Sequence, residues 1–235
     1  MPLNEYRRKR DFKVTSEPLD ENKPAKKVTA ALIYVIQKHR ASHLHYDFRL
    51  EWNGVLLSWA VPKGPSLDSS VKRLAMLVED HPIAYANFEG VIPEGEYGAG
   101  TVMVWDTGTW APESADVDEA LQKGDLKFTL HGEKLKGSWV LVRTRGFGGS
   151  RGHSSWLLIK HRDPNASERD IALEEPHSVL THRLLADIAR EGGGDVEKAA
   201  SGDPPAKADA VISSAKTGAP RKRTRQRSSK KKIIR

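Results

Sequence analysis

The residues best suited to chemistry lie together in the stretch KHRASHLHYDFRLEW at positions 38–52, which holds His39, His43, His45, Asp47 and Arg49. Side chains of a strand point alternately to its two faces, so an extended segment over residues 42–50 would place the last four of these on one face. The opposite face would be apolar and suited to a core, with Leu44, Tyr46, Phe48 and Leu50. His39 has the same parity, and a turn or bulge at residues 40–42 would fold it back beside His45.

Two imidazoles and one carboxylate form a common three-ligand set for a divalent ion such as Mn²⁺ or Zn²⁺, with positions left for water and substrate. Arg49, two residues beyond Asp47, could hold a phosphate through two hydrogen bonds. The alternative is a solvated polar face on a half-exposed strand. The crowding of these residue types favours metal or phosphate chemistry. It leaves open which histidines bind the metal, because His43 also has the required parity.

A second polar cluster, Glu79-Asp80-His81, precedes a proline and is followed by Tyr85. Glu79 and His81 would share one face of a strand. His81 could act as a general acid or bind phosphate, and Glu79 could orient a ligand imidazole. The alternative is an exposed strand end before a proline turn.

The loop IPEGEYGAGTV at 92–102 is rich in turn-forming residues. It lacks the lysine and serine or threonine of a P-loop, so we interpret it as a structural β-turn. Single cations near strand ends, at Lys63 and within residues 156–160, could meet a phosphate backbone.

Short apolar or alternating segments separated by glycine and proline dominate residues 29–161, a pattern typical of an antiparallel β-barrel or sandwich. The predicted strands are 31–37, 46–52, 56–61, 74–79, 100–105, 127–130, 138–144 and 156–161. One helix is predicted between a cap at Asp116 and a stop at Gly124. A second would begin after Ser178, run through Ile188 and stop at residues 192–194.

Charge is distributed unevenly along the chain. The formal net charge is +7, but nine of the 38 basic residues and no acid lie in residues 221–235, which leaves 29 basic and 31 acidic residues, or −2, for the rest. Such a segment attracts polyanions without reading sequence. The alternative is a solubilising extension. Because the same chain also carries a candidate phosphate site, we favour nucleic-acid binding as the role of the basic segment.

The composition limits the class of protein. Hydrophobic residues make up 38% of the chain, below the usual share for a compact domain, so part of it should be unpacked. The absence of cysteine excludes disulfides and cysteine-based zinc sites. There is no signal-peptide core and no apolar run of about 18 residues. We expect a soluble, cytoplasmic, nucleoid-associated protein.

Several stretches resemble the 3′-phosphoesterase domain of bacterial DNA ligase D. They are YRRKRDFKVTSEP (6–18), YVIQKHRASHLHYDFRLEWNGVLLSWAVPKGPS (34–66), VEDHPIAYANFEGVIPEGEYGAGTVMVWDTGTW (78–110), LHGEKLKGSWVLVR (130–143) and WLLIKHRD (156–163). Together they cover about residues 5–190. The resemblance implies a mainly β fold, a small antiparallel barrel with one or two flanking helices. The composition of the C-terminal residues, rich in small and basic residues and without an aromatic, predicts a disordered basic C-terminal tail.

The resemblance also implies an activity, namely Mn²⁺-dependent removal of a ribonucleoside from a DNA 3′ end and hydrolysis of the remaining 3′-phosphate to a 3′-OH during non-homologous end joining. Carried over by position, the metal ligands would be His39, His45 and Asp47, and the scissile phosphate would contact Arg49 and His81. Supporting positions would be Glu79, Tyr85, Gln37, Lys63 and Arg73, with Arg10, Asp11 and Glu17 near the N-terminus. His43 is not a ligand in that family.

The resulting organisation is an N-terminal arm (1–28) that completes the active site, a barrel domain (29–192) and a disordered basic tail (193–235). No adenylating ligase motif and no polymerase domain are recognisable, so the chain is either a separately encoded phosphoesterase or an excised module, and we favour the first. We also expect it to act as a monomer. Its substrate would be DNA 3′ ends, and its partners a DNA ligase and the Ku end-joining machinery. The alternatives are a non-catalytic nucleic-acid-binding module and a phosphoesterase acting on RNA ends.

Overall fold

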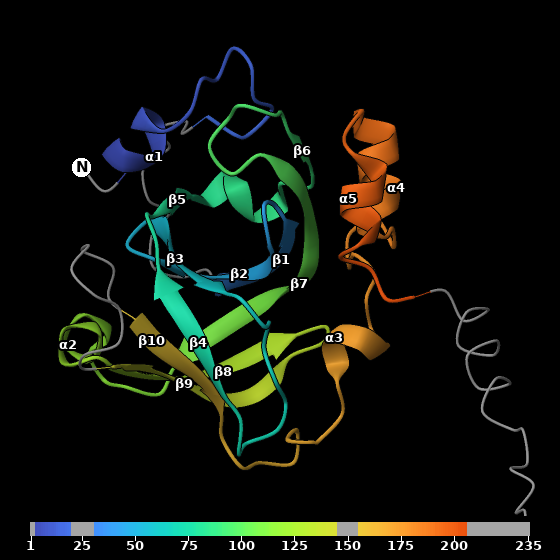
Figure 1. Ribbon diagram of the computed structural model, residues 1–235. Coiled ribbons are helices and arrows are strands. Elements are labelled where there is room, and N and C mark those ends of the chain that lie inside the picture. Colours follow the sequence, from blue (N-terminus) through green and yellow to red (C-terminus); the bar gives the residue numbers. More distant parts are fainter. Residues whose placement is uncertain (1–2, 20–30, 145–154, 206–235) are drawn as a thin grey trace, which may run out of the picture. The chain divides into compact units, whose positions relative to one another are not determined.

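Eight antiparallel strands close into a barrel in the computed structural model, which describes residues 3–19, 31–144 and 155–205 (Figure 1). The strands are β1 (Leu32–Arg40), β2 (Leu44–Trp52), β3 (Val55–Val61), β4 (Lys72–Leu77), β7 (Gly100–Pro112), β8 (Asp125–Gly132), β9 (Lys136–Arg143) and β10 (Ser155–Lys160). Their order is β1-β2-β3-β4-β10-β9-β8-β7, and β7 pairs with β1 to close the barrel. The predicted barrel is therefore confirmed, and each of the eight expected strands corresponds to one barrel strand.

Two short strands extend the barrel, and the sequence did not predict them as separate elements. β5 (His81–Pro82) pairs with β3, and β6 (Gly90–Ile92) pairs with β7. The segment expected to run as one strand to residue 79 ends at Leu77, so His81 belongs to β5 instead.

The barrel interior is filled by alternate side chains of its strands. Tyr46, Phe48 and Leu50 are buried there, as the alternation in β2 predicted, and they pack in one cluster with Trp59 and Trp139. Leu44, expected on the same face, is only partly buried and packs in a separate cluster with Leu185 and Ile188. Burying a large apolar side chain contributes roughly 1.5–3 kcal/mol. The apolar interior therefore fixes the orientation of β2, so that its polar residues must point outward.

A second apolar layer covers part of the outer surface of the barrel. It is formed by the N-terminal segment and by the 3-10 helix η1 (Ile83–Asn87), which pack against outward-facing residues of β1, β3 and β7. In Figure 1, α1, β5 and β6 lie on the same side of the barrel. The outward-facing polar residues of β1 and β2 thus adjoin a covered surface.

The N-terminal segment has more structure than the sequence indicated. The arm predicted at residues 1–28 contains a short helix, α1 (Asn4–Arg8), and Tyr6 within it is fully buried. Residues 1–2 and 20–28 of the predicted arm lie outside the described residues. The Tyr6 ring centroid lies 5.2 Å from that of His81 and 6.0 Å from that of Tyr85. These aromatic contacts stabilise the segment, and they are made to residues about 75 positions away.

The first predicted helix is confirmed, and the second begins later than predicted. The Asp116 carboxylate accepts a hydrogen bond from the amide of Glu119 at the start of α2 (Val117–Lys123), and Gly124 ends the helix with a φ of +79°. The second helix is α4 (Leu185–Gly192). It does not begin after Ser178. The Ser178 hydroxyl accepts from the amides of Leu180 and Thr181 and caps a single turn, but His182 has a left-handed φ of +58°, which ends that turn before a helix can form.

The C-terminal boundary also differs from the prediction. The short helices α3 (Ile171–Glu174) and α5 (Val196–Ala200) belong with the barrel to one compact unit that ends at residue 204, so the predicted tail does not begin at residue 193. The reason is Asp203, whose carboxylate accepts hydrogen bonds from the amides of Leu185 and Ala186 at the start of α4.

The predicted disorder of residues 206–235 lies outside the described residues. Within the part of the chain that the structure describes, no helix is both long and apolar enough to cross a membrane.

Replacing Gly100 by alanine should destabilise the barrel more than replacing Gly95. Their φ angles of +151° and +92° are both unfavourable for other residues, but only at Gly100 would an added Cβ meet backbone, 2.2 Å from the carbonyl oxygen of Arg40. We expect Gly100→Ala to lower the free energy of unfolding by about 2–4 kcal/mol and Gly95→Ala by about 1 kcal/mol. Chemical denaturation measures both, and equal losses would contradict the close approach of β7 to β1.

Candidate active site

Three of the predicted ligands converge on the outer face of the β1–β2 hairpin. His39 lies directly opposite His45 in the strand register. The distances to Asp47 Oδ2 are 3.6 Å from His39 Nδ1 and 3.7 Å from His45 Nε2. One possible ligand atom from each residue lies within 4.8 Å of the others. The turn after β1 does fold His39 back beside His45, and the exposed His43 is not part of this group.

Two backbone carbonyls orient the imidazoles. The Gly98 oxygen lies 2.8 Å from His39 Nε2, and the His43 oxygen lies 3.0 Å from His45 Nδ1. A carbonyl can only accept, so these nitrogens carry the protons and the other nitrogen of each ring offers its lone pair beside Asp47. Metal-binding histidines are commonly held in this way. A turn motif does not reveal this role of Gly98, because any residue type can supply a backbone carbonyl.

Asp47 is held in its ionised form. It is 7% exposed, and burial by itself would raise its pKa. The Arg49 guanidinium, 3.3 Å away, outweighs burial and holds the pKa of Asp47 well below its ordinary value. Two nitrogen donors and one anionic oxygen donor therefore lie together, a set that fits Mn²⁺, Zn²⁺ and related divalent ions.

Arg49 is fixed on several sides of its guanidinium. Its Nε donates to Gln37 Oε1 at 2.8 Å, and its Nη1 donates to Ser58 Oγ at 2.9 Å. Gln37 is fully buried and donates in turn to the backbone oxygens of Tyr85 and Phe88. The Arg49 guanidinium is thus pre-oriented beside the His39–His45–Asp47 group. Ser58 was not predicted, because a single serine in a strand carries no distinctive pattern.

His81 lies against Arg49 as a neutral imidazole. Its Nδ1 is 2.9 Å from the backbone oxygen of Glu79 and 2.9 Å from Arg49 Nη1, and its Nε2 is 3.3 Å from Arg10 Nη2. A proton on Nδ1, donated to the Glu79 carbonyl, leaves Nε2 free to accept from Arg10. Arg49 Nη1 is itself a donor, so in this tautomer it touches Nδ1 without forming a hydrogen bond. Burial, and then the charges of Arg49 and Arg10, lower the pKa of His81 well below its ordinary value.

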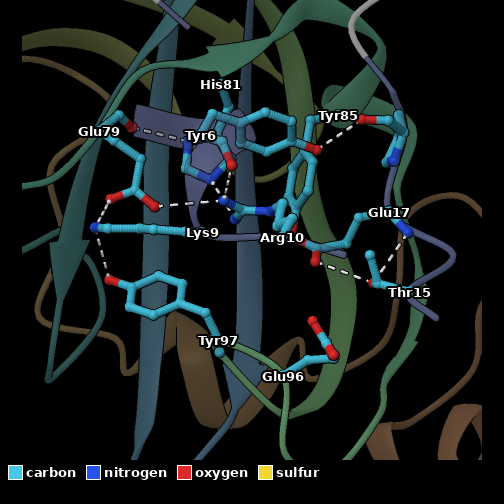
Figure 2. Close-up of polar contacts among 12 residues, drawn as sticks. Tyr6, Lys9, Arg10, Thr15, Glu17, Glu79, His81, Tyr85, Glu96 and Tyr97 are labelled. Atoms are coloured by element: carbon cyan, nitrogen blue, oxygen red, sulfur yellow. Dashed lines mark hydrogen bonds and ion pairs between the residues drawn. The ribbon is translucent and has the colours of Figure 1, made fainter. Parts of the chain in front are cut away.

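The N-terminal arm contributes Arg10 and Glu17 to the same site (Figure 2). Arg10 Nε donates to Glu17 Oε1 at 2.8 Å, and both side chains are almost entirely buried. The Glu17 carboxylate also accepts hydrogen bonds from the hydroxyls of Tyr85, at 2.9 Å, and Thr15, at 3.0 Å. Two of the three arm residues that the family resemblance singled out, Arg10 and Glu17, therefore belong to this cluster, and Arg10 contacts His81 directly.

Glu79 faces the arm. Its carboxylate lies 3.0 Å from Lys9 Nζ and 3.5 Å from Arg10 Nη1, whereas the sequence suggested that it would orient a ligand imidazole. Lys9 was not predicted. Asp11 lies on the exposed side of the arm, where its amide donates to Glu96 at 3.4 Å and its carboxylate accepts from the amide of Lys13.

The remaining predicted cations are not brought into this cluster. Lys63 is exposed in the turn after β3. Arg73 on β4 lines a separate cavity of about 180 Å³ together with Asp68 and Asp170. Lys160 is buried, and it donates to the Ser138 carbonyl at the start of β9, which is a structural role.

A closed antiparallel barrel with an outward-facing His–His–Asp group, a fixed arginine and a neutral histidine has the features of a metal-binding hydrolase. Residues 37–143 match the family described as the DNA Ligase D 3′-phosphoesterase domain. This part of the chain belongs to that family.

Relatives in several bacteria carry the same region. The chain is 56% identical over 187 residues to the multifunctional non-homologous end joining protein LigD of Pseudomonas aeruginosa, a match that covers 78% of this chain and 22% of that protein. It is 49% identical over 170 residues to the LigD of Mycobacterium tuberculosis, described as a multifunctional non-homologous end joining DNA repair protein, covering 72% of this chain and 21% of the relative. The chain therefore spans about a fifth of the length of these relatives.

Replacing Asp80 by asparagine should stabilise the protein at neutral pH only. Burial, and then the neighbouring carboxylate of Glu79, raise the pKa of Asp80 to about 6. Above that pH the folded protein must ionise a half-buried group that the unfolded chain ionises freely, so stability is lost as the pH rises through 6. We expect Asp80→Asn to raise the Tm at pH 7.5 by about 2–4 °C, with no change near pH 4.

The control is the exposed Asp125, which lies away from this cluster on β8. Asp125→Asn should change the Tm little, and equally at both pH values. If Asp80→Asn shifted the Tm by the same amount at pH 4 and pH 7.5, ionisation of Asp80 would not be the cause.

Proposed function

We propose that this chain is a divalent-metal-dependent phosphoesterase that processes DNA 3′ ends in non-homologous end joining. It would remove a 3′-terminal ribonucleoside to leave a 3′-phosphate, and then hydrolyse that phosphate to a 3′-OH. The observation that carries the proposal is the placement of His39, His45 and Asp47 beside Arg49 and His81 on one face. Membership of the LigD 3′-phosphoesterase family supports a DNA end as the substrate.

His39 Nδ1, His45 Nε2 and the Asp47 carboxylate would hold the ion, for which we propose Mn²⁺. When bound, the ion supplies positive charge that offsets the charge developing on the phosphate in the transition state. Arg49 borders the same group and is held in place by Gln37 and Ser58, so its charge would help to stabilise a phosphate bound there.

His81 would contact the scissile phosphate beside Arg49 while water attacks phosphorus. Burial and the two arginines beside it favour its neutral form. Glu17, Tyr85 and Glu79 would support this step by holding Arg10 and Lys9 in place, and Gln37 by holding Arg49. Asp11, Lys63 and Arg73 lie farther out and would meet the substrate strand.

The proposed setting is the bacterial cytoplasm, on DNA in the nucleoid. A DNA ligase and the Ku end-joining machinery are the proposed partners, since the relatives are named as end-joining proteins. We propose that the chain acts as a monomer.

Removing one ligand should abolish both activities. His39→Ala and Asp47→Ala each remove one of three donors, and we expect release of phosphate and of ribonucleoside to fall by more than about 100-fold, since even residues that only orient ligands typically account for 10–100-fold. Activity is measured on primers ending in a 3′-phosphate or a 3′-ribonucleotide, across Mn²⁺, Zn²⁺, Co²⁺ and Mg²⁺. Mn²⁺ affinity, measured by electron paramagnetic resonance, should fall in parallel.

His43→Ala is the matched control, because it removes an exposed imidazole from the same hairpin and retains the carbonyl that orients His45. It should leave activity and Mn²⁺ affinity close to those of the unaltered protein. Mn²⁺-dependent release by Asp47→Ala would contradict the ligand assignment. Absence of release by the unaltered protein with every metal would indicate a non-catalytic nucleic-acid-binding module, and a preference for all-RNA primers would indicate an RNA-end enzyme.

Deleting residues 206–235 should weaken DNA binding and reduce its dependence on salt. These residues hold eleven Lys or Arg and one Asp, so their contacts with phosphates release counterions. A cut after Pro205 retains Asp203, which caps α4. The slope of log Kd against log salt concentration should become shallower while kcat on a short primer stays the same. An unchanged slope would assign this segment another role, such as binding a repair partner.

A further inference from the structure

Tyr97 is an exposed aromatic residue at the edge of the candidate active site. Its exposed fraction is 50%, and it is the one aromatic among the exposed large hydrophobic residues of the described ranges 3–19, 31–144 and 155–205. A single exposed hydrophobic residue is ordinary on a protein surface. The position and rigidity of Tyr97 are what distinguish it.

The loop that carries Tyr97 is fixed to the metal-ligand group. The next residue, Gly98, provides the carbonyl that lies 2.8 Å from His39 Nε2. Within the loop, the amide of Glu96 donates to the Pro93 carbonyl at 3.2 Å and that of Ala99 to the Glu96 carbonyl at 3.1 Å. The backbone of Tyr97 therefore has little freedom relative to His39.

The ring of Tyr97 is held from the arm side as well. Lys9 Nζ donates to its hydroxyl at 3.3 Å and lies 4.4 Å from the ring centroid. Figure 2 shows Lys9 between Tyr97 and Glu79, bonded to both. The Arg10 guanidinium is 5.9 Å from the ring centroid, and its Nη2 contacts His81. The Arg10 guanidinium therefore links the Tyr97 ring to His81, which belongs to the proposed catalytic group.

We propose that Tyr97 is the stacking platform for the base of the 3′-terminal nucleoside, the part of the substrate that leaves in the diester reaction. This inference rests on the proposed function, which places the scissile phosphate beside His39, Asp47 and Arg49. The leaving nucleoside is terminal, so one face of its base has no neighbour in the strand. A rigid, exposed aromatic ring can cover that face.

Stacking of this kind is tolerant of sequence, because every base has a π-face, and it is worth about 1–3 kcal/mol per base. An end-processing enzyme must accept any terminal base, and stacking on the Tyr97 ring would meet that requirement because it does not depend on the identity of the base. A 3′-phosphate end has no nucleoside beyond its phosphate. Tyr97 therefore contributes to the diester reaction and makes no contribution to phosphate hydrolysis.

The test compares two variants on three primers. Tyr97→Leu removes the ring and keeps apolar bulk, whereas Tyr97→Phe keeps the ring and removes only the hydrogen bond to Lys9. The primers end in a ribonucleotide, in an abasic ribose joined through the same diester, or in a 3′-phosphate. Tyr97→Leu should raise KM on the ribonucleotide primer by about 5- to 150-fold, the equivalent of ~1–3 kcal/mol. It should leave the abasic and 3′-phosphate primers unchanged, and Tyr97→Phe should resemble the unaltered protein on all three.

Two results would overturn the inference. Equal losses on all three primers would show that Tyr97 acts on the loop or on the metal ligands and does not contact the base. Equal losses for Tyr97→Phe and Tyr97→Leu would assign its role to the hydrogen bond with Lys9.

A binding measurement without turnover separates this inference from the proposed function. A primer with 2-aminopurine as its terminal base, bound in the presence of EDTA, should lose fluorescence on binding to the unaltered protein and to Tyr97→Phe, and much less on binding to Tyr97→Leu. Tyr97-dependent quenching without cleavage in any metal would sustain the stacking and refute the proposed reaction. If the unaltered protein cleaves the primer but fluorescence quenching is equal in all three proteins, or absent from all three, the stacking is refuted and the proposed reaction stands.

Discussion

The buried pair between Asp47 and Arg49 is the interaction on which the site depends. The two residues are 7% and 2% exposed, and their charges would be costly in such surroundings without each other. The arginine keeps the carboxylate ionised between two imidazoles, and Gln37 and Ser58 keep the arginine oriented. A buried ion pair contributes little to net stability. We therefore interpret the pair as serving the proposed metal site, because it keeps Asp47 ionised and Arg49 oriented.

The barrel separates stability from chemistry by using the two faces of the same strands. Tyr46, Phe48 and Leu50 fill the interior, while Asp47 and Arg49 between them point outward. Polar residues on the outer face of the barrel would be solvated if nothing covered them. Here the second apolar layer, which includes Tyr6 and Tyr85, brings the arm and η1 against this face and excludes water from His81 and Arg49. The arm is thus held by hydrophobic contacts and aligned by the Arg10–Glu17 pair.

Short apolar segments separated by glycine and proline were enough to predict the barrel strands. Alternation in β2 predicted the core residues Tyr46, Phe48 and Leu50 and the common face of His45, Asp47 and Arg49. The pairing of His39 with His45 followed from the short turn between their strands. The exclusion of His43 rested on the family resemblance, since parity alone left it open. The Gly98 carbonyl could not have been found, because a backbone acceptor can be supplied by any residue type.

Long-range contacts account for the other differences. Tyr6 is ordered by residues about 75 positions away, so the composition of the arm could not reveal its helix. Asp203 caps α4 from 17 and 18 residues downstream, which places the C-terminal boundary later than the run of small and polar residues suggested. Lys63 and Arg73 were placed by resemblance, and the structure locates them outside the cluster formed by the other predicted residues.

The central claim is that His39, His45 and Asp47 form one metal site. Anomalous diffraction at the manganese edge, from crystals of the full chain grown with Mn²⁺, tests it most directly. We predict a single strong peak within bonding distance of His39 Nδ1, His45 Nε2 and an Asp47 carboxylate oxygen, with Arg49 beside it. A peak bound to His43, or no ordered peak at this hairpin at saturating Mn²⁺, would contradict the account.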